Sequence, residues 1–205
     1  MEDFSPAKFP LSFGVLAGGK SRRMGADKAW LTLRGRSFLE TVLDAGSGFS
    51  ERLVSLSADA EPFIIEGVKL VRDESADCGP LEGIRQLLRA CTKDACLVTA
   101  TDMPFLSADF LAALAARYPG SGNLALTLNG KFEPLCSIYA RACLPEIDRL
   151  RAESRAKPSL LFGRVPTVTV RFEDMGFPER VLWNINRAEE YRAILEEGFD
   201  HAGAL

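Results

Sequence analysis

A short apolar run that passes directly into a glycine-rich, basic loop is the feature that most constrains this chain. Residues 11–16 (LSFGVL) have the composition of a buried strand, and residues 17–28 (AGGKSRRMGADK) follow without a spacer. The backbones of Gly18 and Gly19 can approach a phosphate closely and offer N–H donors. Residues 20–36 hold six cations and one anion, although the net charge of the chain is −3. The segment predicts a strand that ends in a polyphosphate-binding loop, with a solvated basic loop as the plainer alternative.

Strand-like and helix-like patterns alternate along the rest of the chain. The predicted strands are 52–56, 69–72, 95–99, 124–128, 135–139 and 167–172, and the predicted helices are 38–45, 81–91, 107–117, 143–153, 158–162 and one that opens at 186–190. Asn129-Gly130 favours a hairpin or a return strand between 124–128 and 135–139. The alternation predicts an α/β fold with a single doubly wound, mostly parallel sheet flanked by helices. We expect this domain to span 11–205 and residues 1–10 to form a loose extension.

Composition argues against several classes of protein. A net charge of −3 gives no general attraction to nucleic acid or to anionic membranes, and no apolar run approaches the ~20 residues of a membrane span. The five cysteines lie mostly among apolar residues, so we expect buried thiols and a cytoplasmic protein. The only histidine, His201, lies near the end of the sequence, which argues against a Ser/His/Asp triad.

Two aspartates follow predicted strands, as the glycine-rich loop does. Asp73 comes after strand 69–72 and Asp102 after strand 95–99. In sheets of this kind ligands bind beyond the carboxyl ends of the strands, so we expect both aspartates and the loop to face one crevice. Asp102 suits Mg²⁺, which proteins usually hold with one or two carboxylates and substrate phosphates. The plainer alternatives are that Asp73 caps a turn and that Asp102 is only a turn residue.

The same region also matches a different phosphate-binding pattern. Residues 14–21 (GVLAGGKS) fit the P-loop pattern G-x-x-x-x-G-K-[ST]. That pattern requires a strand before its first glycine, whereas Gly14 falls inside the predicted strand. The residues after Ser21 include Gly25 and do not open a clean amphipathic helix. We therefore favour a loop at 17–27 over a P-loop NTPase.

The loop and several later segments resemble the molybdenum cofactor guanylyltransferases, which belong to a larger group with the cytidylyltransferases and the nucleotide-sugar pyrophosphorylases. The segments that carry the resemblance are 16–28 (LAGGKSRRMGADK), 78–84 (CGPLEGI, similar to G-P-L-x-G), 101–105 (TDMPF, similar to a D-x-P metal motif), Pro134-Leu135 with Tyr139, and 183–186 (WNIN). They run in the family's order from about residue 14 to residue 191. The resemblance implies a Rossmann-like nucleotidyltransferase fold.

The resemblance also implies roles for particular residues. The nucleotide-binding positions are Leu16, Ala17, Gly18, Gly19, Lys28, Ser57, Asp73 and Asp102; Asp102 is also the metal ligand, and Asn184 and Asn186 are the acceptor-binding positions. Ser57 stands where the family often has asparagine, and the adjacent glycines at 18 and 19 favour GTP over CTP. Asn186 has the alternative role of a helix N-cap. Catalysis would depend on Arg23, Lys28 and Asp102, because a guanidinium fork can clamp phosphate oxygens and an ammonium group supplies a point charge.

These residues together predict a reaction. We expect Mg²⁺-dependent transfer of GMP from GTP to the terminal phosphate of a molybdopterin-type cofactor, with release of pyrophosphate. Partners would be GTP, that cofactor and other proteins of molybdenum cofactor synthesis or use. The alternatives are a CTP-dependent enzyme, another phosphorylated acceptor such as a sugar phosphate, and a non-catalytic nucleotide or pterin carrier. Intact Lys28 and Asp102 argue against the carrier, which needs no metal site.

Overall fold

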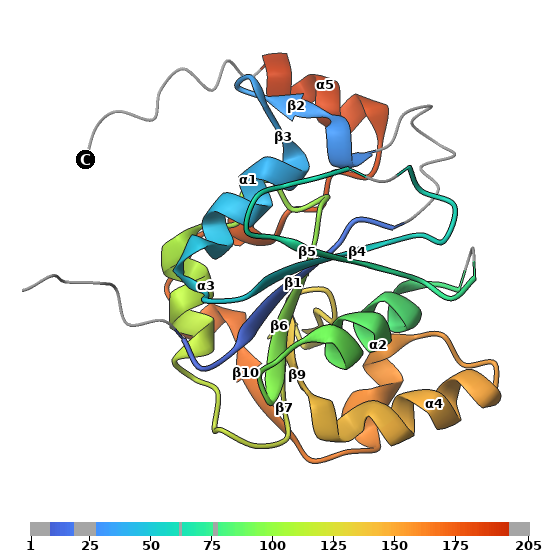
Figure 1. Ribbon diagram of the computed structural model, residues 1–205. Helices are drawn as coiled ribbons and strands as arrows, with labels where there is room; N and C mark the ends of the chain where they lie inside the picture. The colour runs from blue at the N-terminus through green and yellow to red at the C-terminus, as the bar shows by residue number, and fades with distance from the viewer. Residues whose placement is uncertain (1–8, 19–27, 62, 76–77, 197–205) are drawn as a thin grey trace, which may run out of the picture.

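Parallel strands form the centre of this computed structural model, which describes residues 9–18, 28–61, 63–75 and 78–196 (Figure 1). The strand order across the main sheet is β10-β7-β9-β6-β1-β4-β5. Its strands are β1 (Ser12–Leu16), β4 (Arg52–Leu56), β5 (Lys69–Arg72), β6 (Ala95–Ala100), β7 (Asn123–Leu128), β9 (Ser137–Ala140) and β10 (Thr167–Arg171), with β8 (Lys131–Phe132) paired to β7. β1 pairs in parallel with β4 and β6, whereas β9 is antiparallel to both of its neighbours. The predicted doubly wound, mostly parallel sheet is confirmed.

Helices cover both faces of this sheet (Figure 1). The helices α1 (Phe38–Ala45) and α3 (Ala108–Ala115) pack on one face, and α2 (Pro80–Ala90) and α4 (Leu144–Ala152) pack on the other. The last helix, α5 (Ala188–Glu196), lies by the small hairpin of β2 (Thr32–Leu33) and β3 (Arg36–Ser37). Short 3-10 turns complete the chain: Lys28–Trp30, Gly46–Gly48, Arg141–Cys143, Pro158–Gly163, Phe172–Asp174 and Glu179–Leu182.

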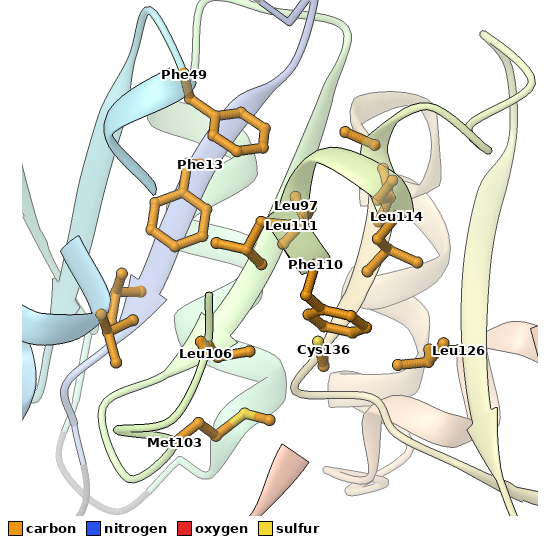
Figure 2. Packing of buried hydrophobic residues seen from close by; sticks show 14 of the residues in the cluster. Phe13, Phe49, Leu97, Met103, Leu106, Phe110, Leu111, Leu114, Leu126 and Cys136 are labelled. Carbon is orange, nitrogen blue, oxygen red and sulfur yellow. The ribbon is translucent and has the colours of Figure 1, made fainter. Parts of the chain in front are cut away.

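A separate apolar core lies on each face of the sheet. On the α1/α3 face, Phe110 of α3 packs near Leu126 of β7 and near Cys136, which immediately precedes β9 (Figure 2). Phe13 of β1 is fully buried and stacks on Phe49 with ring centroids 5.3 Å apart. The five cysteines are all free thiols, and four of them are buried, as expected. Within the described residues, no helix is both long and apolar enough to cross a membrane.

Local signals fixed several helix ends. Ser37 and Glu40 form a reciprocal capping box at the start of α1, which spans the predicted residues. Ser107 accepts a hydrogen bond from the Phe110 N–H and caps α3. The predicted helix at 158–162 is instead a 3-10 segment, because Pro158 begins a run too short for α-helical hydrogen bonds to accumulate.

The predicted hairpin is formed differently. Asn129-Gly130, both at positive φ, join β7 to the two-residue β8. The strand predicted at 135–139 is β9, and it inserts between β6 and β7, pairing Leu124 with Ile138. The sequence signal for a turn was correct, and the return strand was also correct. What the pattern could not show was that both are present.

We expect Gly46→Ala to destabilise the protein by about 1–3 kcal/mol. A methyl group at position 46 would overlap the ring of Phe13, whose Cγ would lie 2.9 Å away. That ring cannot move, because it is fully buried and stacked on Phe49. Urea unfolding measures the loss, and Gly48→Ala in the same 3-10 turn is the control, since its nearest neighbour would lie at 3.5 Å. Equal stability of the two variants would contradict the packing argument.

Candidate functional site

The carboxyl ends of four parallel strands place most of the predicted site at one edge of the sheet. The backbone ladder continues just past the strands: the N–H of Ala17 donates to Ser55 (2.8 Å), that of Asp73 to Leu56 (2.9 Å), and that of Thr101 to Leu16 (3.1 Å). The expected shared edge therefore includes Leu16 at the end of β1, Ala17 and Gly18 after it, Ser57 after β4, Asp73 after β5 and Asp102 after β6.

The glycine-rich loop begins at this edge in close contact with β4. A methyl group added to Gly18 would lie 3.1 Å from the backbone nitrogen of Ser57, so the chain passes tightly over the end of β4. Gly19 and Arg23 lie outside the described residues. The described chain resumes at Lys28, which opens the 3-10 turn Lys28–Trp30. The Ser57 hydroxyl donates to the Asp59 carboxylate at 2.7 Å, so it is engaged within its own turn.

The P-loop alternative is wrong because Gly14 is a strand residue. It pairs with Leu53 on one side and with Val98 on the other. A methyl group at this position would come within 2.7 Å of a Leu87 methyl and 2.9 Å of the Cys96 sulfur. Gly14 therefore lets α2 pack closely on β1. It lies inside a paired strand and not in a phosphate-binding loop.

Asp73 is a half-buried carboxylate whose charge is disfavoured. Burial is the main cause, and it raises the pKa of Asp73 to about 6; the hydrogen bond from the Ser55 hydroxyl to its Oδ1 (3.2 Å) acts against this rise. The negative charge of Glu82 raises this pKa further, and Arg151 lowers it. A carboxylate held in this way at a strand end can accept hydrogen bonds from the hydroxyl or N–H groups of a nucleoside.

Asp102 lies at the end of β6 and is tied to the C-terminal part of the chain. Its Oδ1 atom is buried, and its backbone carbonyl accepts a hydrogen bond from the N–H of Ile185 at 2.8 Å. That bond brings Asn184 and Asn186 next to the predicted metal ligand. The described residues contain no group of three or more His, Cys, Asp or Glu side chains that could hold a metal. Proteins commonly hold Mg²⁺ with one or two carboxylates, while substrate phosphates and water complete its shell, so the chemistry of the Asp102 carboxylate fits this ion.

The two predicted acceptor residues are held by local hydrogen bonds. The Asn184 side-chain amide donates to the Leu182 carbonyl at 3.1 Å. The Glu190 carboxylate accepts from the N–H groups of Asn186 (2.7 Å) and Arg187 (3.0 Å) and so caps the start of α5. Helix α5 begins at Ala188, so Arg187 and not Asn186 is the N-cap, and Glu190 supplies the carboxylate half of a capping box one residue later than predicted. The side chain of Asn186 is exposed at the same edge.

Sequence reasoning missed an aromatic and cationic corner beside these asparagines. The guanidinium of Arg180 lies over the ring of Phe105 (4.3 Å to the centroid) and over Trp183 (5.3 Å). Trp183 remains 46% exposed. Phe105 and Arg180 also line a groove of about 680 Å³ that continues past Arg34 and Arg36. The only signal in the sequence was position, since Phe105 follows the D-x-P segment and Trp183 precedes Asn184.

Comparison with known proteins gives a consistent result. A family profile described as "MobA-like NTP transferase domain" matches residues 14–166. The chain is similar to probable molybdenum cofactor guanylyltransferases of Carboxydothermus hydrogenoformans (29% identical, covering 91% of this chain and 95% of the relative) and Halalkalibacterium halodurans (32% identical, 86% and 93%). Among solved structures it is similar to molybdopterin-guanine dinucleotide biosynthesis protein A from Archaeoglobus fulgidus, with a TM-score of 0.76, 25% identity, and coverage of 91% of this chain and 98% of that one.

Proposed function

The chain belongs to the MobA-like NTP transferase family, and from this premise we propose that it transfers GMP from GTP to the terminal phosphate of a molybdopterin-type cofactor. The observation that carries the proposal is the shared edge of the sheet. There Ala17 and Gly18, Asp73 and Asp102 follow three parallel strands, and the Ile185 N–H donates to the Asp102 carbonyl. The residues that we assign to the nucleotide are thereby adjacent to those that we assign to the acceptor. Three relatives or neighbours whose names specify guanylyl transfer or guanine dinucleotide synthesis support GTP as the donor.

The proposed reaction needs no nucleophile from the protein. An oxygen of the acceptor phosphate, already ionised at neutral pH, attacks the α-phosphorus of GTP, and the bond to the bridging oxygen of the leaving pyrophosphate breaks. Both reactants are anions, so the protein must align them and neutralise charge. Mg²⁺ held at Asp102 would supply Lewis-acid charge neutralisation on the phosphates. The backbone at Ala17 and Gly18 would hold the nucleotide, while Arg23 and Lys28 would bind its phosphate oxygens.

Asp73 would hold the nucleoside end of GTP, because its carboxylate accepts hydrogen bonds at the end of β5. Ser57 contributes less at this end, since its hydroxyl already donates to Asp59. Where the family often has an asparagine side chain in contact with the nucleotide, this chain would use the backbone of Ser57, which lies against Gly18.

The acceptor would bind on the other side of Asp102. Asn184 and Asn186 offer amide groups there, and Trp183 presents a partly exposed indole on which a flat heterocycle can stack. The cation of Arg180 lies next to this ring and suits an acceptor that carries phosphate. This arrangement favours a ring-bearing, phosphorylated acceptor over a simple sugar phosphate. A non-catalytic carrier is disfavoured, because it needs no carboxylate at the metal position.

We expect pyrophosphate release from GTP when Mg²⁺ and molybdopterin cofactor are both present, and little release from ATP, CTP or UTP. The assay compares the four triphosphates, with EDTA and with omission of the cofactor as controls. Release from CTP with none from GTP would overturn the choice of base. Tight binding of GTP without turnover under any of these conditions would support the carrier.

A further inference from the structure

A fully buried carboxylate lies in the first turn of α2, outside the residues assigned to the reaction. Glu82 has no exposed surface, although it is one of the residue types rarely found buried. Its Oε1 accepts from the Gln86 amide at 2.6 Å and faces Arg85 at 3.4 Å. Its Oε2 lies 2.8 Å from Nε of Arg151, which comes from α4. Contacts of this kind offset the cost of removing a carboxylate from water.

The same cluster includes the residue that follows Asp73. The carboxylate of Glu74 pairs with Arg85 (2.8 Å) and Arg89 (2.7 Å) from α2 and lies 3.6 Å from Arg151. The hydrogen bond from Arg85 lowers the pKa of Glu74 to about 2. Arg85 in turn pairs with Asp148 of α4 at 2.5 Å. Helix α4 is therefore joined to α2 and to the end of β5 by one set of charges.

Two contacts connect this cluster to Asp73. The N–H of Glu74 donates to Oε1 of Glu82 at 3.3 Å, which holds the backbone next to Asp73. The start of α2 also packs tightly on the site edge, because a methyl group on Gly83 would lie 2.7 Å from Leu16 and 3.2 Å from the Ser55 hydroxyl. That hydroxyl is the one that donates to Asp73. A movement of α2 or of Glu82 would therefore shift the backbone next to Asp73 and the Ser55 hydroxyl that donates to it.

Charged groups from two helices face the Asp73 carboxylate. Glu82 comes from α2 and Arg151 from α4, and the neutral Ser55 comes from β4. Burial is the largest influence on the pKa of Asp73, and after it Glu82 and Arg151 act in opposite directions. Removal of either charge is thus expected to change the charge state of Asp73 with a sign that can be stated in advance.

We propose that Glu82, held by Arg151, is a positioning residue for Asp73, and that it acts on this aspartate through the backbone of Glu74 and through its own negative charge. The inference rests on the proposed role of Asp73 in nucleotide binding. Nucleotide affinity then depends on a salt-bridge cluster between α2 and α4 that does not touch the nucleotide.

The test is the pH dependence of GTP binding, measured by calorimetry in the presence of Mg²⁺ for the parent protein and three variants. Affinity is expected to fall as Asp73 becomes protonated below about pH 6. The acid limb is the part of the affinity–pH curve in which affinity falls toward low pH. Glu82→Gln keeps an oxygen that can accept from Glu74 and Gln86 but removes the negative charge, which lowers the pKa of Asp73. The acid limb should therefore move to lower pH. Arg151→Gln removes the opposing cation, so the limb should move to higher pH. Each shift should be on the order of half a pH unit or more.

Glu146→Gln is the matched control, because Glu146 is an α4 carboxylate that pairs with Arg149 and Arg164, each at 3.0 Å. The acid limb of the Glu146→Gln variant should coincide with that of the parent protein. General loosening of the helix pair cannot move the limb in two opposite directions, so the signs separate positioning from stability. Arg151 is more exposed than Glu82, so where Glu82→Gln fails to fold, Arg151→Gln still tests the electrostatic part of the proposal, and an unchanged pH dependence in that variant overturns it.

The outcomes are distinguishable. Opposite shifts for Glu82→Gln and Arg151→Gln support the proposal, and an NMR titration of the Asp73 carboxyl should reproduce them without nucleotide. GTP binding with superimposed acid limbs overturns the positioning role alone. Absence of GTP binding by the parent protein at every pH overturns the proposed function, and the inference with it.

Discussion

Asp102→Asn should reduce pyrophosphate release from GTP by on the order of 10³-fold, because the amide would lack the negative charge with which Asp102 is proposed to bind Mg²⁺. A loss of that size corresponds to about 4 kcal/mol of transition-state stabilisation. The Ile185 N–H donates to the backbone carbonyl of residue 102, and this hydrogen bond survives the substitution. The variant should therefore keep the Asn184–Asn186 segment in place, with an unchanged circular dichroism spectrum.

Steady-state rates at several Mg²⁺ concentrations provide the measurement. The control is Asp109→Asn, the same chemical change on an exposed residue in the first turn of α3, and its rate should stay within about twofold of the parent. Near-normal turnover by Asp102→Asn at limiting Mg²⁺ would show that another group holds the metal. If high Mg²⁺ concentrations fully restore the rate of the variant, the role of Asp102 is limited to raising the affinity for the metal.

The fold could be predicted from the sequence wherever the signal was local. The strands β1 and β6 are buried throughout and are mostly apolar in sequence, and the Ser37–Glu40 capping box marked the start of α1 within its own turn. The position of β9 was not encoded in this way. Its antiparallel placement between β6 and β7 depends on pairing across the sheet, which the periodicity of a four-residue strand does not specify.

The candidate site also contains residues that the local sequence could predict and residues that it could not. Asp73 and Asp102 could be predicted at one edge because residues that follow parallel strands share that edge. The bond from the Ile185 N–H to the Asp102 carbonyl joins residues 83 positions apart, and the sequence did not predict it; the resemblance of the WNIN segment to a family motif only assigned Asn184 and Asn186 to the acceptor. Glu82 and Arg180 were missed because each acts through tertiary partners, Arg151 for the first and Phe105 for the second. Glu82 lies on the polar face of α2 with Arg85, Gln86 and Arg89, so nothing in the local sequence marked it as buried.

Asp73→Asn should weaken GTP binding and, above pH 6, stabilise the protein without nucleotide. Loss of a charged acceptor at a buried hydrogen bond costs about 1.5–3 kcal/mol, which corresponds to a roughly 10- to 100-fold increase in Kd. Asparagine can still accept from the Ser55 hydroxyl through its side-chain oxygen, so the local geometry should persist. Calorimetry at pH 8 measures the affinity. Asp94→Asn, an exposed change just before β6 at the opposite end of the strands, is the control.

The stability effect follows from the direction of the Asp73 pKa. Burial raises this pKa from 3.8 to about 6, so the folded state holds its proton more tightly than the unfolded state does. Stability from this group is fully present below about pH 4, is lost as the pH rises to 6, and stays lost above it. The loss is at most about 3 kcal/mol, since each tenfold change in proton affinity is worth about 1.4 kcal/mol.

Asparagine carries no such cost, so the difference in unfolding free energy between Asp73→Asn and the parent should be small at pH 4, grow between pH 4 and 6, and then level off. Urea unfolding across this range measures it, with Asp94→Asn expected to follow the parent. A variant that is less stable than the parent at pH 8 would mean that attraction to Arg151 outweighs burial. The predicted combination, weaker binding with greater stability, is expected of a residue retained for its ligand at the expense of the fold.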